Sequence, residues 1–248
     1  MYLQILKFTL FSFITVAAFT GCGGGSSSSS ESSSSTPNTT TQITDKVQSP
    51  LTASTTYQNL FHLLETQTDK TGLVMDAHGV EGLRVTCATQ EATTTKNGLF
   101  KCEGTPLTIY LGNFKVGTLS QVPKDKIIYT QDILNVPRAA TVHPDVTKLS
   151  MILQSLDEDA DLSNGIEIIK ESMNILDNEL ANFTNIHQLT LDDTNHIIDN
   201  VIAQRKANNE DVKLHKVSKK EAQINLTEAL SNMPGSNIDI AAFNSITL

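Results

Sequence analysis

The chain of 248 residues has no tryptophan, few aromatic residues of any kind and fewer basic than acidic side chains. Its 18 basic and 27 acidic residues give a net charge of −9, which repels the phosphate groups of nucleic acids and of anionic lipids. We therefore expect no nucleic-acid partner and no attachment to a membrane through a basic surface. Hydrophobic residues make up 39% of the chain, enough to form a core.

Recognisable catalytic motifs are also missing. The six histidines show no H-E-x-x-H spacing, there is no G-x-S-x-G sequence, and no glycine-rich phosphate loop follows a predicted strand. His187 and His196 flank a predicted helix start, where they are expected to face solvent or cap the helix. Asp192 and Asp193 are expected to place negative charge in the first turn of the same helix. The sequence predicts a protein that is not an enzyme. The alternative is an envelope enzyme with an unrecognised carboxylate site.

No apolar run reaches the roughly 20 residues needed to span a bilayer. The uncharged run 8–19 follows Lys7 and has the length of the apolar region of a secretory signal. Directly after it, Phe19-Thr20-Gly21-Cys22 resembles the lipobox of bacterial lipoprotein precursors. The resemblance implies that residues 1–21 are a signal peptide and that Cys22 carries acyl chains such as palmitate, which anchor it to a membrane. Because Gly23 is not aspartate, it also implies the outer membrane of a Gram-negative cell. The alternative is an ordinary secretory signal with an incidental cysteine.

Residues 22–56 are rich in glycine, serine and threonine and have very few apolar side chains. Such a segment buries too little surface to offset the entropy of ordering, so it is predicted to be a disordered tether. A flexible chain of this length has a root-mean-square span on the order of 30 Å. The tether would hold the folded part clear of the lipid surface.

Acylation of Cys22 would leave Cys87 and Cys102 as the remaining two of the three cysteines. An exported chain meets an oxidising compartment, so a disulfide between them is predicted. Closing this loop would contribute about 3 kcal/mol in the chain-entropy model. Two buried free thiols, or a redox-active pair, are the alternatives.

The folded part is predicted to be α+β: a small antiparallel β-sandwich followed by a small helical bundle. Residues 57–140 form the β-module, with a short leading helix carrying Tyr57 and Leu64. Alternating runs over 72–118 place Leu83, Val85 and Cys87 on one strand face, and Asn97-Gly98 and Gly112-Asn113 predict turns between strands.

Residues 141–248 form the helical region. Apolar stripes recur at helical spacing over 146–156, 166–183, 197–202 and 222–233. Ser218 and Glu221 have the spacing of a capping box at the start of the last helix, and Pro234-Gly235 is expected to end it.

The β-module resembles a module of bacterial surface lipoproteins that is similar to the carboxypeptidase-regulatory-like, prealbumin-like sandwich. The similar segments are Gly72–Asp76, Val80–Gly82, Thr93–Phe100, Leu111-Gly112 and Val116-Gly117. The helix and acidic turn over 148–166 resemble the segment that follows this module in the same lipoproteins, and the resemblance covers 70 to about 233. It implies the architecture and the location, and assigns no activity.

An acidic turn is the best candidate for a site. Asp157, Asp159 and Asp161 place carboxylates at alternate positions, and Asn164 follows, which gives oxygen ligands suited to a structural Ca²⁺ ion. The turn is not an EF-hand, since Leu162 and Ile168 occupy the positions of the required glycine and glutamate. Ala160 stands where the similar lipoproteins have glycine, which disfavours a left-handed turn. The alternative is that these residues only cap helices, one of which begins near Gly165.

Together these features predict a lipid-anchored envelope protein with a non-catalytic binding module, and no cofactor apart from the Ca²⁺ ion considered above. Its partners would be the membrane, through acylated Cys22, and an envelope or surface protein or ligand that the residues do not identify. It would face either the periplasm or the cell surface.

Overall fold

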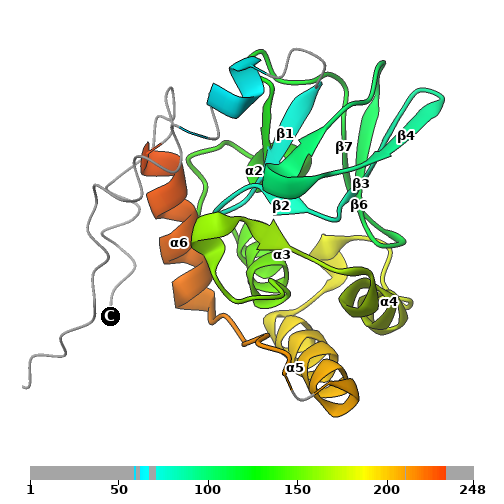
Figure 1. Cartoon of the computed structure of the whole chain (residues 1–248), viewed down its shortest axis with the longest axis vertical. Helices are drawn as coiled ribbons and strands as arrows, with labels where there is room; N and C mark the ends of the chain where they lie inside the picture. Colours follow the sequence, from blue (N-terminus) through cyan, green and yellow to red (C-terminus); the bar gives the residue numbers. More distant parts are fainter. Residues whose placement is uncertain (1–58, 60–61, 67–70, 210, 233–248) are drawn as a thin grey trace, which may run out of the picture. The chain divides into compact units, whose positions relative to one another are not determined.

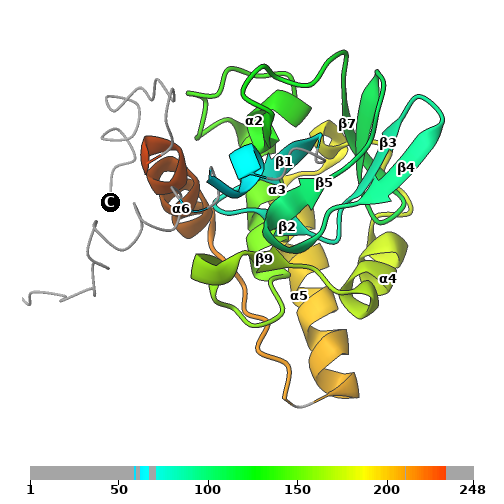
Figure 2. The same ribbon diagram turned by 45° about the horizontal axis from the view of Figure 1, so that its top comes forward.

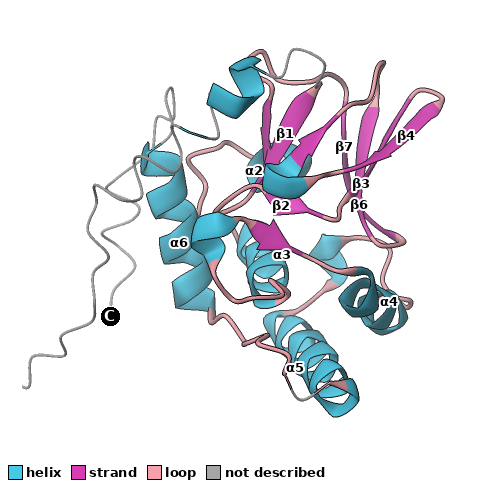
Figure 3. Ribbon diagram, viewed as in Figure 1, coloured by secondary structure: helices cyan, strands magenta, loops and turns pink. Residues whose placement is uncertain are grey.

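Strands occupy the first half of the described chain and helices most of the second half, so the fold belongs to the predicted α+β class (Figures 1 and 3). The computed structural model describes residues 59, 62–66, 71–209 and 211–232. The predicted signal peptide, Cys22, the predicted tether and Pro234-Gly235 lie outside these residues. No helix in the described ranges is both long enough and apolar enough to cross a lipid bilayer.

A four-stranded antiparallel sheet has the order β4-β3-β6-β7. The predicted alternation is confirmed, because Leu83, Val85 and Cys87 are all buried. The hairpin predicted at Gly112-Asn113 joins β6 to β7, and Gly112 has the positive φ of 62° that favours glycine in a tight turn. The strands are β3 (Arg84–Cys87), β4 (Gln90–Thr93), β6 (Leu107–Leu111) and β7 (Phe114–Leu119).

A three-stranded sheet of order β5-β1-β8 corrects the prediction of a wholly antiparallel module. β1 (Gly72–Met75) is antiparallel to β5 (Leu99–Phe100) but parallel to β8 (Ile127–Tyr129). Every residue of these strands is buried, as is usual for parallel strands that are covered on both faces. A continuous apolar run has no alternation, so the sequence does not show which way such a strand runs or what it pairs with.

A second parallel pair connects the predicted strand region to the predicted helical region. β2 (Val80–Glu81) pairs with β9 (Ile166–Glu167), and the two lie side by side in Figure 2. Ile166, which the periodicity assigns to a helix, therefore lies in a strand, and that part of the prediction is wrong. The described parts of the predicted segments 57–140 and 141–248 belong to one compact unit.

The disulfide predicted between Cys87 and Cys102 is present, with its Cα atoms 6.0 Å apart. Its position differs from the expected hairpin. Asn97-Gly98 forms a turn with positive φ angles of 65° and 76°, but the strand after it, β5, pairs with β1 and not with β3. Cys87 ends β3 and Cys102 follows β5, so the disulfide links the two larger sheets to each other.

The helices confirm most of the predicted stripes. α3 is buried along almost its whole length and lies against α5 and α6 (Figure 2). The capping box is formed, since the Glu221 amide donates to Ser218 Oγ at 3.2 Å and the Ser218 amide to Glu221 Oε2 at 3.3 Å. The described part of the leading helix, 62–66, buries Leu64. The helices are α2 (Thr130–Ile133), α3 (Pro144–Ser155), α4 (Lys170–Glu179), α5 (Leu191–Asn208) and α6 (Lys219–Asn232).

A buried polar network connects β1 to α3 and α6. Asp76 directly follows β1 and is 0% exposed. Its Oδ1 accepts a hydrogen bond from Ser150 Oγ at 2.5 Å and its Oδ2 one from Gln154 Nε2 at 2.7 Å. Asn225 on α6 donates in turn to Gln154 Oε1 at 2.8 Å. Burial raises the pKa of Asp76, although its hydrogen bonds from Ser150 and Gln154 act to lower it.

Candidate functional site

The acidic turn, residues 157–167, leaves the C-terminal end of α3 and enters β9. Ala160 adopts a φ of 59°, so the left-handed turn forms even without a glycine at this position. An alanine in this conformation costs roughly 1–2 kcal/mol, because its Cβ approaches the backbone. The expectation that alanine at this position argues against a left-handed turn is therefore wrong.

All four predicted ligand residues make hydrogen bonds within the turn, and three of them, Asp159, Asp161 and Asn164, do so near its exposed surface. Asp159 Oδ1 accepts from the Asp161 amide at 3.0 Å, and Asp159 Oδ2 accepts from Asn164 Nδ2 at 2.7 Å. Asp161 Oδ1 accepts from the Ser163 amide at 3.1 Å and so caps a short 3₁₀ turn, Leu162–Asn164. No helix begins near Gly165, since α4 starts at Lys170 after an uncapped Ile169. The alternative that the turn caps helices is therefore confirmed only for Asp161 and the 3₁₀ turn, and the helix start expected near Gly165 is wrong.

Asp157 differs from the other three residues because it is only 1% exposed. Its Oδ1 accepts a hydrogen bond from the Glu167 amide at 2.9 Å. Its Oδ2 is buried and has no hydrogen bond of normal distance and angle among the described residues, although the Asp161 amide also acts on this carboxylate. Burial first, and then the carboxylates of Asp159 and Asp161, raise the pKa of Asp157 to about 6, although the Glu167 and Asp161 amides act to lower it.

Further acidic groups approach the turn from β2 and β9. Glu81 and Glu167 are paired directly across the parallel bridge. Burial and the neighbouring Glu167 raise the pKa of Glu81, while Lys96 lowers it. These three side chains also line a cavity of about 60 Å³ together with Asp159 and Asn164. The sequence did not reveal Glu81 as a neighbour, because it lies on a two-residue strand far from the turn in the chain.

His78 lies close to the same turn and was not predicted as part of it. It is 3% exposed, and burial lowers its pKa to about 4 against the opposing effect of Asp161. Its imidazole is therefore neutral at physiological pH and does not compensate the carboxylates. Within the described ranges, no three histidine, cysteine or acidic side chains already converge in a geometry that holds a metal ion.

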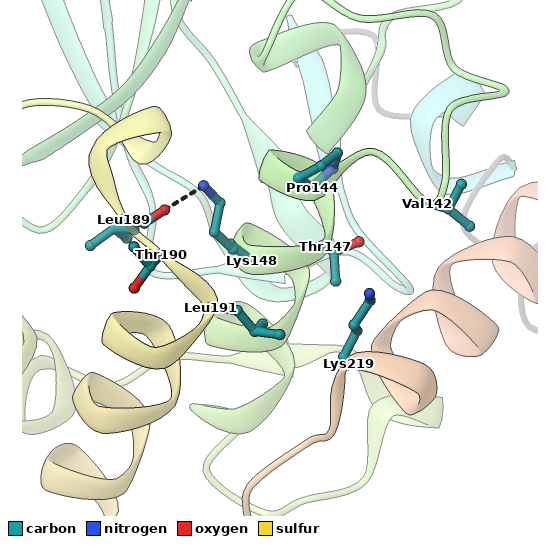
Figure 4. A pocket seen from close by; sticks show the side chains of 8 residues that line it. All are labelled: Val142, Pro144, Thr147, Lys148, Leu189, Thr190, Leu191 and Lys219. Atoms are coloured by element: carbon teal, nitrogen blue, oxygen red, sulfur yellow. Dashed lines mark hydrogen bonds between the residues drawn. The ribbon is translucent and has the colours of Figure 1, made fainter.

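A second candidate site is a cavity of about 290 Å³ at the first residues of three helices, which we call the helix-start cavity. α3 begins at Pro144, α5 at Leu191 and α6 at Lys219, and all three residues line it (Figure 4). Val142 and Leu191 are the exposed large hydrophobic residues of the described chain, each 38% exposed, and both line this cavity.

Lys148 also lines the helix-start cavity, and its ammonium group already has partners within the protein. Its Nζ donates to the carbonyl oxygens of Ile186 and Leu189, at 3.0 and 2.7 Å, and pairs with Asp145 Oδ1 at 2.6 Å. His187 Nδ1 lies 2.5 Å from Asp145 Oδ2. Desolvation opposes ionisation of Asp145, but Lys148 and His187 lower its pKa. Lys148 therefore joins α3 to the segment before α5. Lys219 is the other lysine that lines the cavity.

A larger and more polar hollow, about 520 Å³, lies beside α4 and α5. Arg205 is 5% exposed there and pairs with Glu158 Oε1 at 2.6 Å, and it also donates to Ser172 Oγ at 3.3 Å. The main charge in this hollow is therefore already neutralised by the protein, which makes it a poorer candidate than the other two sites.

Comparison of the chain with protein-family models, with curated proteins and with solved structures gives no significant match. A function for the chain must therefore be inferred from its own residues. The features available for this are the N-terminal motif, the acidic turn and the helix-start cavity.

Proposed function

We propose that the chain is a lipid-anchored envelope protein whose α+β body is a non-catalytic binding module. Cys22 is the anchor, 22–56 the tether and the outer membrane the location. The lipobox resemblance supports the anchor, and the composition of 22–56 supports the tether. The disulfide between Cys87 and Cys102 supports export, because such bonds persist in oxidising compartments.

The finer architecture that we propose is a β-sandwich followed by a helical bundle. Supporting the sandwich, the three-stranded and four-stranded sheets contribute side chains to one hydrophobic cluster. Supporting the bundle, α3 packs on α5 and α6, and α4 packs on α5. The parallel pairs β1–β8 and β2–β9 are additions that an ordinary antiparallel sandwich does not have.

The binding face is the helix-start cavity, and the observation that carries this assignment is the shared position of Val142 and Leu191. Exposed large apolar side chains that gather at one cavity mark a ligand or partner site. The Lys219 ammonium group favours a negative charge beside these apolar walls. The ligand that fits is an apolar group ending in a carboxylate.

The envelope enzyme is the weaker alternative. The raised pKa of Asp157, about 6, is the observation in its favour, since catalytic acids and bases are tuned in this way. The cavity lined by its neighbours Asp159 and Glu167 measures about 60 Å³. Substrate pockets are usually about 300–1,000 Å³, so this cavity holds little more than water.

The anchor is tested by membrane fractionation of cells that make Cys22→Ser. The variant should leave the membrane fraction and lose metabolic labelling by a tagged fatty acid. The double variant Cys87→Ser, Cys102→Ser keeps the lipobox and is the matched control, which should stay labelled and membrane-bound. A Cys22→Ser protein that still fractionates with membranes and is still labelled would overturn the anchor.

The binding face is tested by titrating the full-length Cys22→Ser chain with octanoate and with 1-octanol, followed by nuclear magnetic resonance. Lys219→Gln should weaken octanoate about fivefold, equivalent to about 1 kcal/mol, and leave 1-octanol unchanged. Lys220→Gln is the matched control, because this neighbouring lysine does not line the cavity. Absence of octanoate binding, or equal effects of both variants, would reject the proposed ligand chemistry.

A further inference from the structure

We propose that the acidic turn binds one Ca²⁺ ion through the buried Oδ2 of Asp157 and the carboxylates of Asp159 and Asp161, with the side-chain oxygen of Asn164 as a further ligand. The ion joins the end of α3 to the β2–β9 pair. This site is independent of the helix-start cavity and of the lipid anchor.

The unsatisfied oxygen of Asp157 is the first observation that points to a cation. A buried polar atom without a partner is costly, and buried polar atoms in proteins nearly always have one. Asp157 is only 1% exposed, and its Oδ2 has no hydrogen-bond partner in the described chain. The charges of Asp159 and Asp161 raise the pKa of this carboxylate, against the amides of Glu167 and Asp161. A bound cation would supply the missing partner at this position.

The second observation is the excess of negative charge on the surrounding elements. Glu81 and Glu167 lie opposite each other across the β2–β9 bridge and repel one another. Among the described residues, Lys96 lines the adjacent cavity, and Lys213 acts on Asp159 from a distance. Arg205 is paired with Glu158. Five carboxylates therefore face two available ammonium groups, and a divalent cation would relieve this repulsion.

The chemistry of the donors selects the cation. Every proposed ligand atom is a carboxylate or amide oxygen, and hard cations such as Ca²⁺ and Mg²⁺ prefer oxygen. No cysteine thiol belongs to the cluster, because Cys87 and Cys102 are joined in the disulfide. Ca²⁺ tolerates irregular geometry and six to eight ligands, whereas Mg²⁺ demands a near-ideal octahedron. The proposed ligands come from one irregular loop, so the site suits Ca²⁺ better than Mg²⁺.

Two side-chain rotations complete the site. Asp159 Oδ2 is held by Asn164 Nδ2 at 2.7 Å, and Asp161 Oδ1 by Ser163 Oγ at 2.6 Å. These bonds hold both carboxylates within the turn, and among the described residues no three such side chains converge in a geometry that holds a metal ion. They lie on an exposed surface and are individually worth about 1 kcal/mol, which ion binding readily exceeds. The backbone already has the required turn, with Ala160 in the left-handed region.

The test is calorimetry on the full-length protein after removal of metal with a chelator. Addition of CaCl₂ to ten times its Kd should raise the melting temperature by about 3–6 °C, and Kd should lie in the range of about 10⁻⁴–10⁻³ M. MgCl₂ at the same concentration should shift it by less than half as much. A wild-type protein that shows neither heat of binding nor a shift in 10 mM CaCl₂ overturns the proposal.

Variants locate the site. Asp157→Asn and Asp159→Asn should each weaken Ca²⁺ binding at least tenfold, and the exposed Asp159 keeps the test valid if the buried variant fails to fold. Glu228→Gln on α6 removes an exposed charge outside the turn and should leave Kd unchanged. Equal Ca²⁺ affinity in Asp159→Asn and in the wild type overturns the assignment. Because the readout is Ca²⁺ itself, failure here is separate from failure of the octanoate or fractionation experiments.

Discussion

Two regions of this molecule bury a carboxylate almost completely, and they differ in how they hydrogen-bond it. Behind β1, Asp76 is 0% exposed and both of its oxygens accept hydrogen bonds, from Ser150 and Gln154. In the acidic turn, Asp157 is 1% exposed, but Oδ2 has no partner among the described residues and two further carboxylates lie nearby. Burial alone therefore does not tell the role of an acidic group.

The difference separates a structural group from a group prepared for a ligand. The donors around Asp76 come from α3, and Gln154 is itself held by Asn225 on α6, so removing the carboxylate leaves several buried donors unsatisfied. Around Asp157 the protein supplies the Glu167 amide, but also the repulsion of two neighbouring carboxylates, which a bound cation would relieve. Removing Asp157 should therefore destabilise the fold much less than removing Asp76.

The largest expected effect is that of Asp76→Ala. It should lower the free energy of unfolding by about 3 kcal/mol, because Ser150 and Gln154 lose their acceptor and a void remains. Asp157→Ala, measured with chelator present, is the matched comparison and should cost less than about 1 kcal/mol. The chain has no tryptophan, so urea unfolding is best followed by far-ultraviolet circular dichroism. Equal losses in the two variants would remove the distinction between the regions.

The pH dependence of stability gives the next largest effect. Burial raises the pKa of Asp157 to about 6 from its ordinary value of 3.8, so between these values the folded state binds more protons than the unfolded state. Its contribution to the free energy of unfolding is therefore present below about pH 4 and is lost as the pH rises to about 6, by roughly 2 kcal/mol.

The comparison of wild type with Asp157→Asn isolates this group from Asp76, whose pKa is raised as well. In chelator, the variant should lack the fall of roughly 2 kcal/mol between pH 4 and pH 7. Saturating CaCl₂ should remove most of the same fall in the wild type, because the ion stabilises the ionised carboxylate. If the free energy of unfolding varies with pH in the same way for both proteins in chelator, Asp157 is not the group that titrates.

The sequence predicts the amphipathic elements well and the fully buried ones poorly. The helical stripes and the alternation around Val85 are periodic, and the structure confirms both. β1 and β8 are apolar throughout, so their parallel pairing has no periodic signal. β2 and β9 have two residues each, too few for any period, and their pairing depends on tertiary contacts. The cysteine pair was predicted, but the neighbours of its strands were not.

The candidate sites show the same limit. Asp157, Asp159, Asp161 and Asn164 are adjacent in the chain, so their spacing alone reveals the acidic turn. Glu81 and His78 join it from a distant segment through the β2–β9 pair, which the sequence does not indicate. The helix-start cavity was missed for the same reason, because residues that begin three separate helices meet only in the folded chain.

The smallest expected effect concerns the backbone of the acidic turn. Ala160 has a φ of 59°, and Ala160→Gly should raise the free energy of unfolding by about 1 kcal/mol, because glycine has no Cβ to strain the left-handed turn. Ala203→Gly in the middle of α5 is the matched control and should lower it by about 1 kcal/mol, since glycine disfavours a helix. If urea unfolding shows that Ala160→Gly raises the free energy of unfolding and Ala203→Gly lowers it, the turn is held in a strained conformation in solution. A loss of stability in both variants would show that residue 160 is not left-handed there, and the acidic turn would then lack the backbone that the Ca²⁺ site needs.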